Sequence, residues 1–408
     1  MPGKIPTSTD YAHSWKSTDM HLITSAAKNA ISEWFEENFR TRGELGASVS
    51  IWQQGVEVLS LAHGFCDRQS TRPWDDETLV PVFSSTKAAA AVCCLMALEE
   101  ENLPLDCPVA EIWPEFVGGG KGSMNFAHLL SHTAGLCALD ERVPIFNYES
   151  VVEALERQAP LWEPGTRQGY HARTFGFLMD EIVRRVTGVD SLGEYFRETI
   201  GSPLGLDFWI GLPSAQWERV SPVYPGKISI SNSDQPFLKA YNNSSSLTHR
   251  TFTSPFGLNA VSEYNSSAFW SPGYASLGGV GSARGLGKFY AMLAQEGLWN
   301  GNRLVSESIV RQLGHTLSQE DDSVLLTPIA FAAGVMQDPL DASAESTGGK
   351  LRQHYGPSLS AFGHPGAGGS LAFADPENSI ALSYVMNQME IGALPGTKVL
   401  GMVERLYL

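Results

Sequence analysis

The sequence predicts an α/β protein with antiparallel strands at both ends of the chain and mainly helices between them. Three observations lead to this fold class. A β-hairpin pattern lies near the N-terminus, and three short strand-like runs lie near the C-terminus. The long stretch between them carries helical periodicity.

The N-terminal part begins with an amphipathic helix and continues into a hairpin. Apolar residues recur at helical spacing from His21 to Arg40. Two runs follow, Ala47 to Trp52 and Val56 to Ala62, whose composition is typical of strands. Gln53-Gln54-Gly55 separates them, and a short glycine-containing link of this kind favours a tight turn.

The central feature of the chain is Pro81-Val82-Phe83-Ser84-Ser85-Thr86-Lys87, which runs into an alanine-rich helix. Its hydroxyl residues can cap that helix, which places Ser84 at the helix N-terminus. Residues three apart share a helix face, so the Ser84 hydroxyl and the Lys87 amine can meet. A serine becomes a nucleophile when a base takes its proton, and the Ser84 amide can stabilise an oxyanion. A capped helix with a solvated lysine has the same local pattern.

The middle of the chain places a tyrosine at the entrance of a second helix. Thr174 to Val186 is amphipathic, and Tyr170 lies in the loop before it. Residues 214–270 are rich in Ser, Asn, Pro and Tyr, which predicts a long irregular segment that lines a site. A clear helix follows from Ala283 to Glu296.

The C-terminal part predicts an antiparallel meander closed by a helix. The strand-like runs are Leu359 to Phe362, Ser370 to Ala374 and Ile380 to Val385, and Thr397 to Leu408 is the closing helix. A glycine-rich loop between the first two runs lets a ligand approach backbone N–H groups closely.

Charge and cysteine content restrict the partners and the compartment. The net charge of −16 argues against a nucleic-acid or anionic-membrane surface. The five cysteines are an odd number without metal-ligand spacing, and we interpret them as reduced and intracellular. Met1 to Trp15 have no apolar core for a signal peptide, and we find no run of about 18 apolar residues. We expect a cytoplasmic protein with no membrane partner.

Three motifs have some features of a metal or nucleotide site, but each lacks a residue or a spacing that such a site needs. His128 and His132 are four residues apart, but the glutamate of zinc proteases is absent; a short helix that ends at Gly135 explains them better. The loop at 118–123 lacks a Ser or Thr directly after its lysine. The glycines at 278–281 do not have dinucleotide-binding spacing. We therefore expect no metal and no other cofactor.

Three separated motifs, taken in order, resemble the serine β-lactamase and penicillin-binding-protein superfamily. They are Ser84-Ser85-Thr86-Lys87, Tyr170-His171-Ala172 and His364-Pro365-Gly366. The superfamily has Ser-x-x-Lys, Tyr-x-Asn and Lys-Thr-Gly or variants of them. The chain is most similar to the class C β-lactamase-like branch, which includes family VIII carboxylesterases and eukaryotic β-lactamase-domain proteins.

The resemblance implies a β-lactamase-like antiparallel sheet flanked by the terminal helices and interrupted by a mostly helical domain. This assigns residues 20–65 and 300–408 to the sheet domain and 66–299 to the helical domain, with the site in the cleft between them. It makes Ser84 the nucleophile, with Lys87 and Tyr170 as bases. The oxyanion hole would use the amides of Ser84 and Ala367.

Departures from the family pattern favour esters. Ala172 replaces an asparagine, and His364 and Pro365 replace the lysine and threonine that help to bind a lactam's carboxylate. His171, Ala172, His364 and Gly366 are the expected substrate contacts. We expect a serine carboxylesterase acting on a small-molecule ester. An acyltransferase, a weak β-lactamase or D-aminopeptidase, and an inactive scaffold or polymer-forming protein remain alternatives; the oligomeric state stays open.

Overall fold

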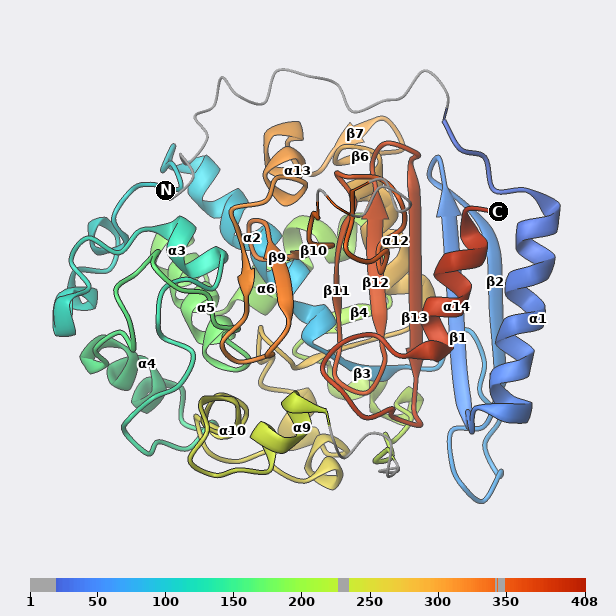
Figure 1. Ribbon diagram of the computed structural model, residues 1–408, viewed down its shortest axis with the longest axis horizontal. Helices are drawn as coiled ribbons and strands as arrows, with labels where there is room; N and C mark the ends of the chain where they lie inside the picture. Colours follow the sequence, from blue (N-terminus) through green and yellow to red (C-terminus); the bar gives the residue numbers. More distant parts are fainter. Residues whose placement is uncertain (1–19, 227–234, 342, 344–348) are drawn as a thin grey trace.

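Eight antiparallel strands form the main sheet, in the order β2-β1-β13-β12-β11-β10-β9-β8 (Figure 1). The computed structural model describes residues 20–226, 235–341, 343 and 349–408. Strand β1, from the N-terminal hairpin, pairs with β13, the last strand of the chain, so both ends of the chain form one sheet. The predicted fold class is confirmed. The strands are β1 (Gly46–Gln53), β2 (Val56–Gly64), β8 (Ser318–Asp321), β9 (Pro328–Phe331), β10 (Met336–Gln337), β11 (Phe362–Pro365), β12 (Leu371–Asp375) and β13 (Ile380–Met386).

Helices cover both faces of this sheet. Strand β1 is buried along its whole length because its alternate side chains serve two cores. Val49 and Ile51 pack in the cluster of α1 (Ser25–Thr41) and α14 (Thr397–Leu406). Trp52 faces α12 (Ala283–Ala294), where a Cβ on Gly287 would lie 2.9 Å from Trp52 Nε1. Helix α12 therefore covers the sheet, although it lies within residues 66–299.

The helical part is built around α2 (Lys87–Glu100), which packs against α5 (Thr174–Thr187). A small sheet of β3 (Val80–Phe83), β5 (Gly279–Gly281) and β4 (Phe208–Ile210) leads the chain into α2. The remaining elements are η1 (Ser84–Thr86), η2 (Val109–Glu111), η3 (Pro114–Gly120), α3 (Phe126–Leu130), α4 (Tyr148–Arg157), α6 (Leu192–Phe196), η4 (Arg197–Gly201), α7 (Ser202–Leu204), η5 (Ser214–Arg219), α9 (Pro236–Tyr241), α10 (Leu247–Thr253), η6 (Val261–Tyr264), α11 (Ser267–Trp270), β6 (Leu298–Trp299), β7 (Asn302–Arg303) and α13 (Glu307–Leu313).

Three sequence-based element boundaries are wrong. The first helix begins at Ser25 rather than His21. The helix predicted to end at Gly135 ends at Leu130, because His132 already has a left-handed φ of 59°. The first C-terminal strand begins at Phe362 rather than Leu359, because Phe362 is buried in the sheet whereas Leu359 is 56% exposed.

The segment 214–270 is only partly irregular in its described part, because short helices interrupt the loops. It forms η5, α9, α10, η6 and α11, and each of these helices has at most seven residues. Helices shorter than two turns show too few apolar repeats for a periodicity to be detected. Residues 227–234 of the segment lie outside the described residues.

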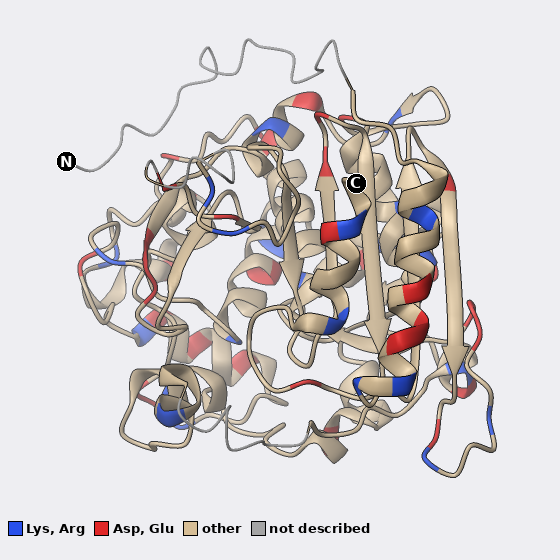
Figure 2. Ribbon diagram, turned by 45° about the vertical axis from the view of Figure 1, so that its right-hand side comes forward, with Lys and Arg blue, Asp and Glu red and all other residues tan. Residues whose placement is uncertain are grey.

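Charged side chains lie mainly outside the main sheet. Figure 2 shows acidic and basic residues interspersed along the helices, whereas the sheet strands are almost entirely uncharged. All five cysteines are free thiols. Within the described ranges, no helix is long and apolar enough to cross a membrane. The segment Met1 to Trp15, which bears on targeting, is outside those ranges.

Candidate active site

Ser84 lies at the junction of β3 and the helical turn η1 that opens α2. The preceding residue, Phe83, has φ 50° and ψ −131°, a conformation that costs a non-glycine residue about 1–3 kcal/mol. Its ring is held in an aromatic cluster, with its centroid 5.1 Å from that of Tyr264. This sharp junction leaves Ser84 lining a pocket of about 310 Å³.

Lys87 is fully buried, and its amine contacts two backbone carbonyls and the Ser84 hydroxyl. Its Nζ lies 2.9 Å from the Ala172 carbonyl, 2.8 Å from the Ser276 carbonyl and 3.4 Å from Ser84 Oγ. Burial lowers the pKa of this amine well below its usual value. A neutral amine has two N–H bonds and one lone pair. With both N–H bonds on carbonyls, the lone pair is available for the Ser84 proton.

Tyr170 is next to both Ser84 and Lys87. Its ring centroid is 4.9 Å from Lys87 Nζ, and the residue is 3% exposed. Burial raises the pKa of the Tyr170 phenol above its ordinary value, and a hydrogen bond with the Ser84 side chain partly offsets that rise. The phenol therefore holds its proton at neutral pH and can donate it.

The backbone amides of Ser84 and Ala367 are the two predicted oxyanion donors. Both residues line the same pocket. Ser84 begins η1, so its amide has no acceptor within the helix. Among the described residues, neither amide donates a hydrogen bond to another backbone group. The two predicted oxyanion donors are thus brought to one pocket.

His364 lies in β11, an inner strand of the main sheet, and Gly366 directly follows that strand. Ser85 Oγ donates to the His364 carbonyl at 3.0 Å, which joins β11 to η1. A Cβ on Gly366 would lie 2.1 Å from Ser370 Oγ and 2.2 Å from the Val82 carbonyl, so only glycine fits this contact. Burial, followed by the nearby Lys87, lowers the pKa of His364 to about 3. His364 is therefore uncharged at neutral pH.

The second motif contributes a carbonyl and a buried ring. Ala172 lines the pocket and its carbonyl accepts from Lys87. His171 is fully buried; its Nδ1 donates to the Gly169 carbonyl at 2.7 Å and its Nε2 accepts from the Leu136 amide at 3.0 Å. Both ring nitrogens are occupied in the protein, and a substrate contact by His171 stays a prediction.

The walls of the pocket are largely aromatic and aliphatic. Arg173 and Glu390 are the only charged residues among the described residues that line it. The Arg173 guanidinium donates to the carbonyls of Pro255, Gly257 and Leu258, so its hydrogen bonds serve the wall itself. The apolar lining residues are Phe83, Phe237, Leu238, Tyr241, Phe252, Val261, Tyr264, Leu277, Met389 and Ile391.

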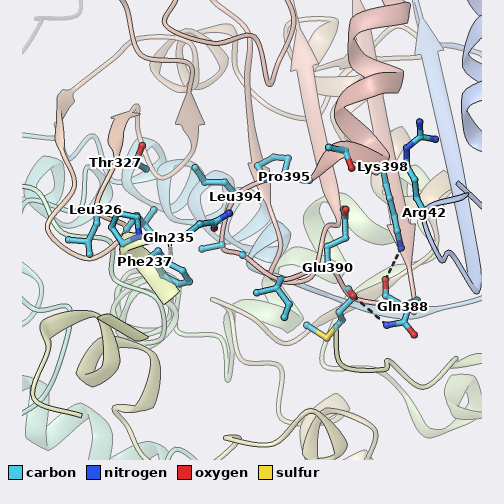
Figure 3. A pocket seen from close by; sticks show the side chains of 18 of the residues that line it. Arg42, Gln235, Phe237, Leu326, Thr327, Gln388, Glu390, Leu394, Pro395 and Lys398 are labelled. Carbon is cyan, nitrogen blue, oxygen red and sulfur yellow. Dashed lines mark hydrogen bonds between the residues drawn. The ribbon is translucent and has the colours of Figure 1, made fainter. Parts of the chain in front are cut away.

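A larger pocket of about 720 Å³ borders this one (Figure 3). Phe237 and the segment 389–393 line both pockets. The Glu390 amide donates to the Gly368 carbonyl at 2.8 Å, which ties this shared wall to the loop of Ala367. Lys398 donates to the Gln388 carbonyl at 3.2 Å and pairs with Glu44 at 3.1 Å.

The roles of several residues at this site cannot be predicted from the sequence pattern. Ser276 supplies only a backbone carbonyl, which any residue type could supply. Arg173 follows the second motif directly, but its acceptors lie more than 80 residues further along the chain. The strain at Phe83 depends on backbone geometry that its residue type does not indicate.

The chain belongs to the beta-lactamase family, because the family model described as Beta-lactamase matches residues 32–396. It is 28% identical over 362 residues to the esterase/beta-lactamase LipL of Mycobacterium tuberculosis, covering 87% of this chain and 80% of that protein. A solved family VIII carboxylesterase superimposes with a TM-score of 0.81 at 31% identity, covering 95% of this chain and 99% of that chain. A penicillin-binding protein homologue from Caulobacter crescentus superimposes with a TM-score of 0.78 at 32% identity, with coverages of 96% and 99%. These relatives support a serine hydrolase.

Proposed function

We propose that the protein is a carboxylesterase that forms an acyl-enzyme on Ser84. The observation that carries this proposal is the position of Lys87. Its two N–H bonds are directed to carbonyls and its Nζ is 3.4 Å from Ser84 Oγ, as expected for a neutral general base.

In the proposed reaction, Lys87 takes the Ser84 proton as Oγ bonds to the ester carbonyl carbon. The amides of Ser84 and Ala367 stabilise the resulting oxyanion. Tyr170 gives its proton to the alcohol oxygen as the ester C–O bond breaks, and the proton on Lys87 then returns to Tyr170. Water then attacks the acyl carbon as Tyr170 accepts the water proton and passes its own proton to Lys87. Lys87 gives that proton to Ser84 Oγ as the bond between Oγ and the acyl carbon breaks.

The surroundings of Ser84 favour an uncharged ester over an anionic lactam. Ala172 has no side-chain amide, and His364 carries no charge at neutral pH. The guanidinium of Arg173 already donates to wall carbonyls. A substrate carboxylate would therefore lose its solvation without gaining a free cation, which is costly.

The test is hydrolysis of p-nitrophenyl acetate and butyrate with intact-mass analysis. We expect a burst of p-nitrophenol and a mass increase equal to one acyl group on the wild type. Ser84→Ala should show neither, and nitrocefin should be cleaved far more slowly than the esters. Wild-type turnover by Ser84→Ala would overturn the proposal, and efficient nitrocefin cleavage would favour the β-lactamase alternative.

Acyl transfer to an alcohol is a second candidate, supported by the two adjoining pockets. An acyl group in the apolar pocket leaves the larger pocket beyond segment 389–393 for an acceptor. Product analysis in the presence of short alcohols separates the two reactions. New ester at a rate above that of hydrolysis supports transfer, and free acid alone contradicts it.

A further inference from the structure

The β8–β9 turn holds the backbone of Tyr170. Asp322, the first residue after β8, is 1% exposed. Its Oδ1 accepts from the Tyr170 amide at 3.2 Å. The same oxygen accepts from the amides of Val324 at 2.9 Å and Leu325 at 2.8 Å. One carboxylate oxygen thus closes the turn and binds the tyrosine loop.

The other carboxylate oxygen joins the same two segments. Asp322 Oδ2 accepts from Gln168 Nε2 at 3.3 Å, and Gln168 Oε1 accepts from Ser318 Oγ at 2.7 Å. The Ser323 amide also donates to the Gln168 carbonyl at 3.0 Å. Among the described residues, every group that hydrogen-bonds to the carboxylate is an N–H donor, and these bonds oppose the rise in the Asp322 pKa that burial causes.

The ring of Tyr170 rests on the same hairpin. It stacks on Phe331 of β9 with a centroid distance of 6.1 Å and an interplanar angle of 1°. The Tyr170 ring centroid is also 5.1 Å from that of the His132 ring. The amide of the next residue, His171, donates to His132 Nδ1 at 3.1 Å. The tyrosine is therefore held through its amide and its ring by an element of the main sheet.

We propose that Asp322 is a positioning residue, which fixes Tyr170 relative to Ser84 by binding the Tyr170 amide to the β8–β9 turn. This inference rests on the proposed role of Tyr170 in proton transfer. Asp322 does not line the Ser84 pocket, and its hydrogen bond with the Tyr170 amide is its link to the site. A displacement of about 1 Å in a catalytic group can reduce the rate by about 10²-fold.

Three variants separate this role from the stability of the turn. Asp322→Ser keeps a hydroxyl that can accept from the amides of Val324 and Leu325, as in Ser/Thr turns. The serine side chain is one bond shorter than that of aspartate, so its oxygen does not also reach the Tyr170 amide. Asp322→Asn keeps an oxygen acceptor at the same reach. Asp321→Asn is the matched control, because Asp321 is the adjacent carboxylate and is exposed.

The readouts are ester-hydrolysis kinetics and hydrogen exchange of the Tyr170 amide. For Asp322→Ser we expect kcat to fall by about 10²-fold with KM nearly unchanged, and faster exchange at Tyr170 with unchanged exchange inside α2. Asp322→Asn should restore most of kcat, and Asp321→Asn should match the wild type. Wild-type kcat or wild-type Tyr170 exchange in Asp322→Ser overturns the proposal.

Two further comparisons cover the remaining outcomes. If Asp322→Ser does not fold, Asp322→Asn decides: a kcat near the wild type supports the proposal, and a fall to the level of Tyr170→Phe overturns it. Wild-type turnover of esters tests the proposed function separately. Amide exchange needs no turnover, so it tests the anchoring of Tyr170 even if no ester is cleaved.

Discussion

The Lys87 amine lies 3.4 Å from the Ser84 hydroxyl and donates to the carbonyls of Ala172 and Ser276, with no acidic hydrogen-bond partner among the described residues. A buried ammonium without a counter-ion is unfavourable, which is why burial lowers the Lys87 pKa. The same arrangement that destabilises the charged amine prepares it to accept the serine proton. Stability and reactivity are therefore opposed at this residue.

Replacing Lys87 by methionine should abolish most activity without unfolding the protein. Loss of a general base reduces the rate by about 10²–10⁴-fold. The methionine removes a costly buried amine but leaves the Ala172 and Ser276 carbonyls without its hydrogen bonds, so we expect a melting temperature close to that of the wild type. Lys87→Arg should be equally inactive, because a guanidinium keeps its charge and cannot accept a proton. Activity of the arginine variant near the wild-type level would contradict a neutral base.

The histidine of the third motif should make stability depend on pH. The folded pKa of His364 is about 3, below the ordinary value of 6.5. Between these values the unfolded chain binds the proton and the folded protein does not, so the free energy of unfolding falls as the pH falls. In His364→Asn, the side-chain amide can still donate to the Pro365 carbonyl, but it does not titrate. The free energy of unfolding of this variant should therefore fall less steeply with pH, by the contribution of one proton. Urea unfolding of both proteins at pH 7, 6 and 5 measures the difference; equal slopes would contradict it.

Gly366→Ala should damage both stability and catalysis. The added methyl would meet Ser370 Oγ and the Val82 carbonyl within 2.2 Å. Overpacking of this kind costs about 1–3 kcal/mol, and relief of the clash would displace the neighbouring Ala367 amide. We expect a lower melting temperature and a lower kcat. Gly122→Ala is the matched control, because nothing lies within 4 Å of its added methyl; equal effects of the two variants would rule out the steric explanation.

The apolar pocket should select the acyl chain or the alcohol by size. Each buried methylene contributes about 0.8 kcal/mol, so kcat/KM should rise roughly fourfold per methylene until the pocket is full. The larger side chain of Val261→Phe should fill part of the pocket. We expect this variant to have a much lower kcat/KM for p-nitrophenyl octanoate and a nearly unchanged one for the acetate. Val117→Phe, at a position 53% exposed, is the control. A uniform loss for both esters would place Val261 outside the substrate's path.

Local pattern was sufficient for several of the longer elements of the fold. The N-terminal hairpin, α5, α12 and α14 all follow from apolar periodicity and turn residues, because each buries one face over several turns or alternate residues. Helices α9 and α10 were not predicted, since six and seven residues give too short a pattern. The β9 and β10 strands were also missed, because they have only four and two residues.

The sequence by itself determined the pairing of Ser84 with Lys87, because a helical start brings residues three apart onto one face. It also determined that position 172 has alanine, without the side-chain amide of the family's asparagine, and that position 364 has histidine in place of the family's lysine. The tertiary structure alone decided the ionisation of these groups. The carbonyls around Lys87 come from 85 and 189 residues away, and burial keeps His364 neutral. Asp322 reaches Tyr170 across 152 residues, a contact that only packing of the sheet against the helical part creates.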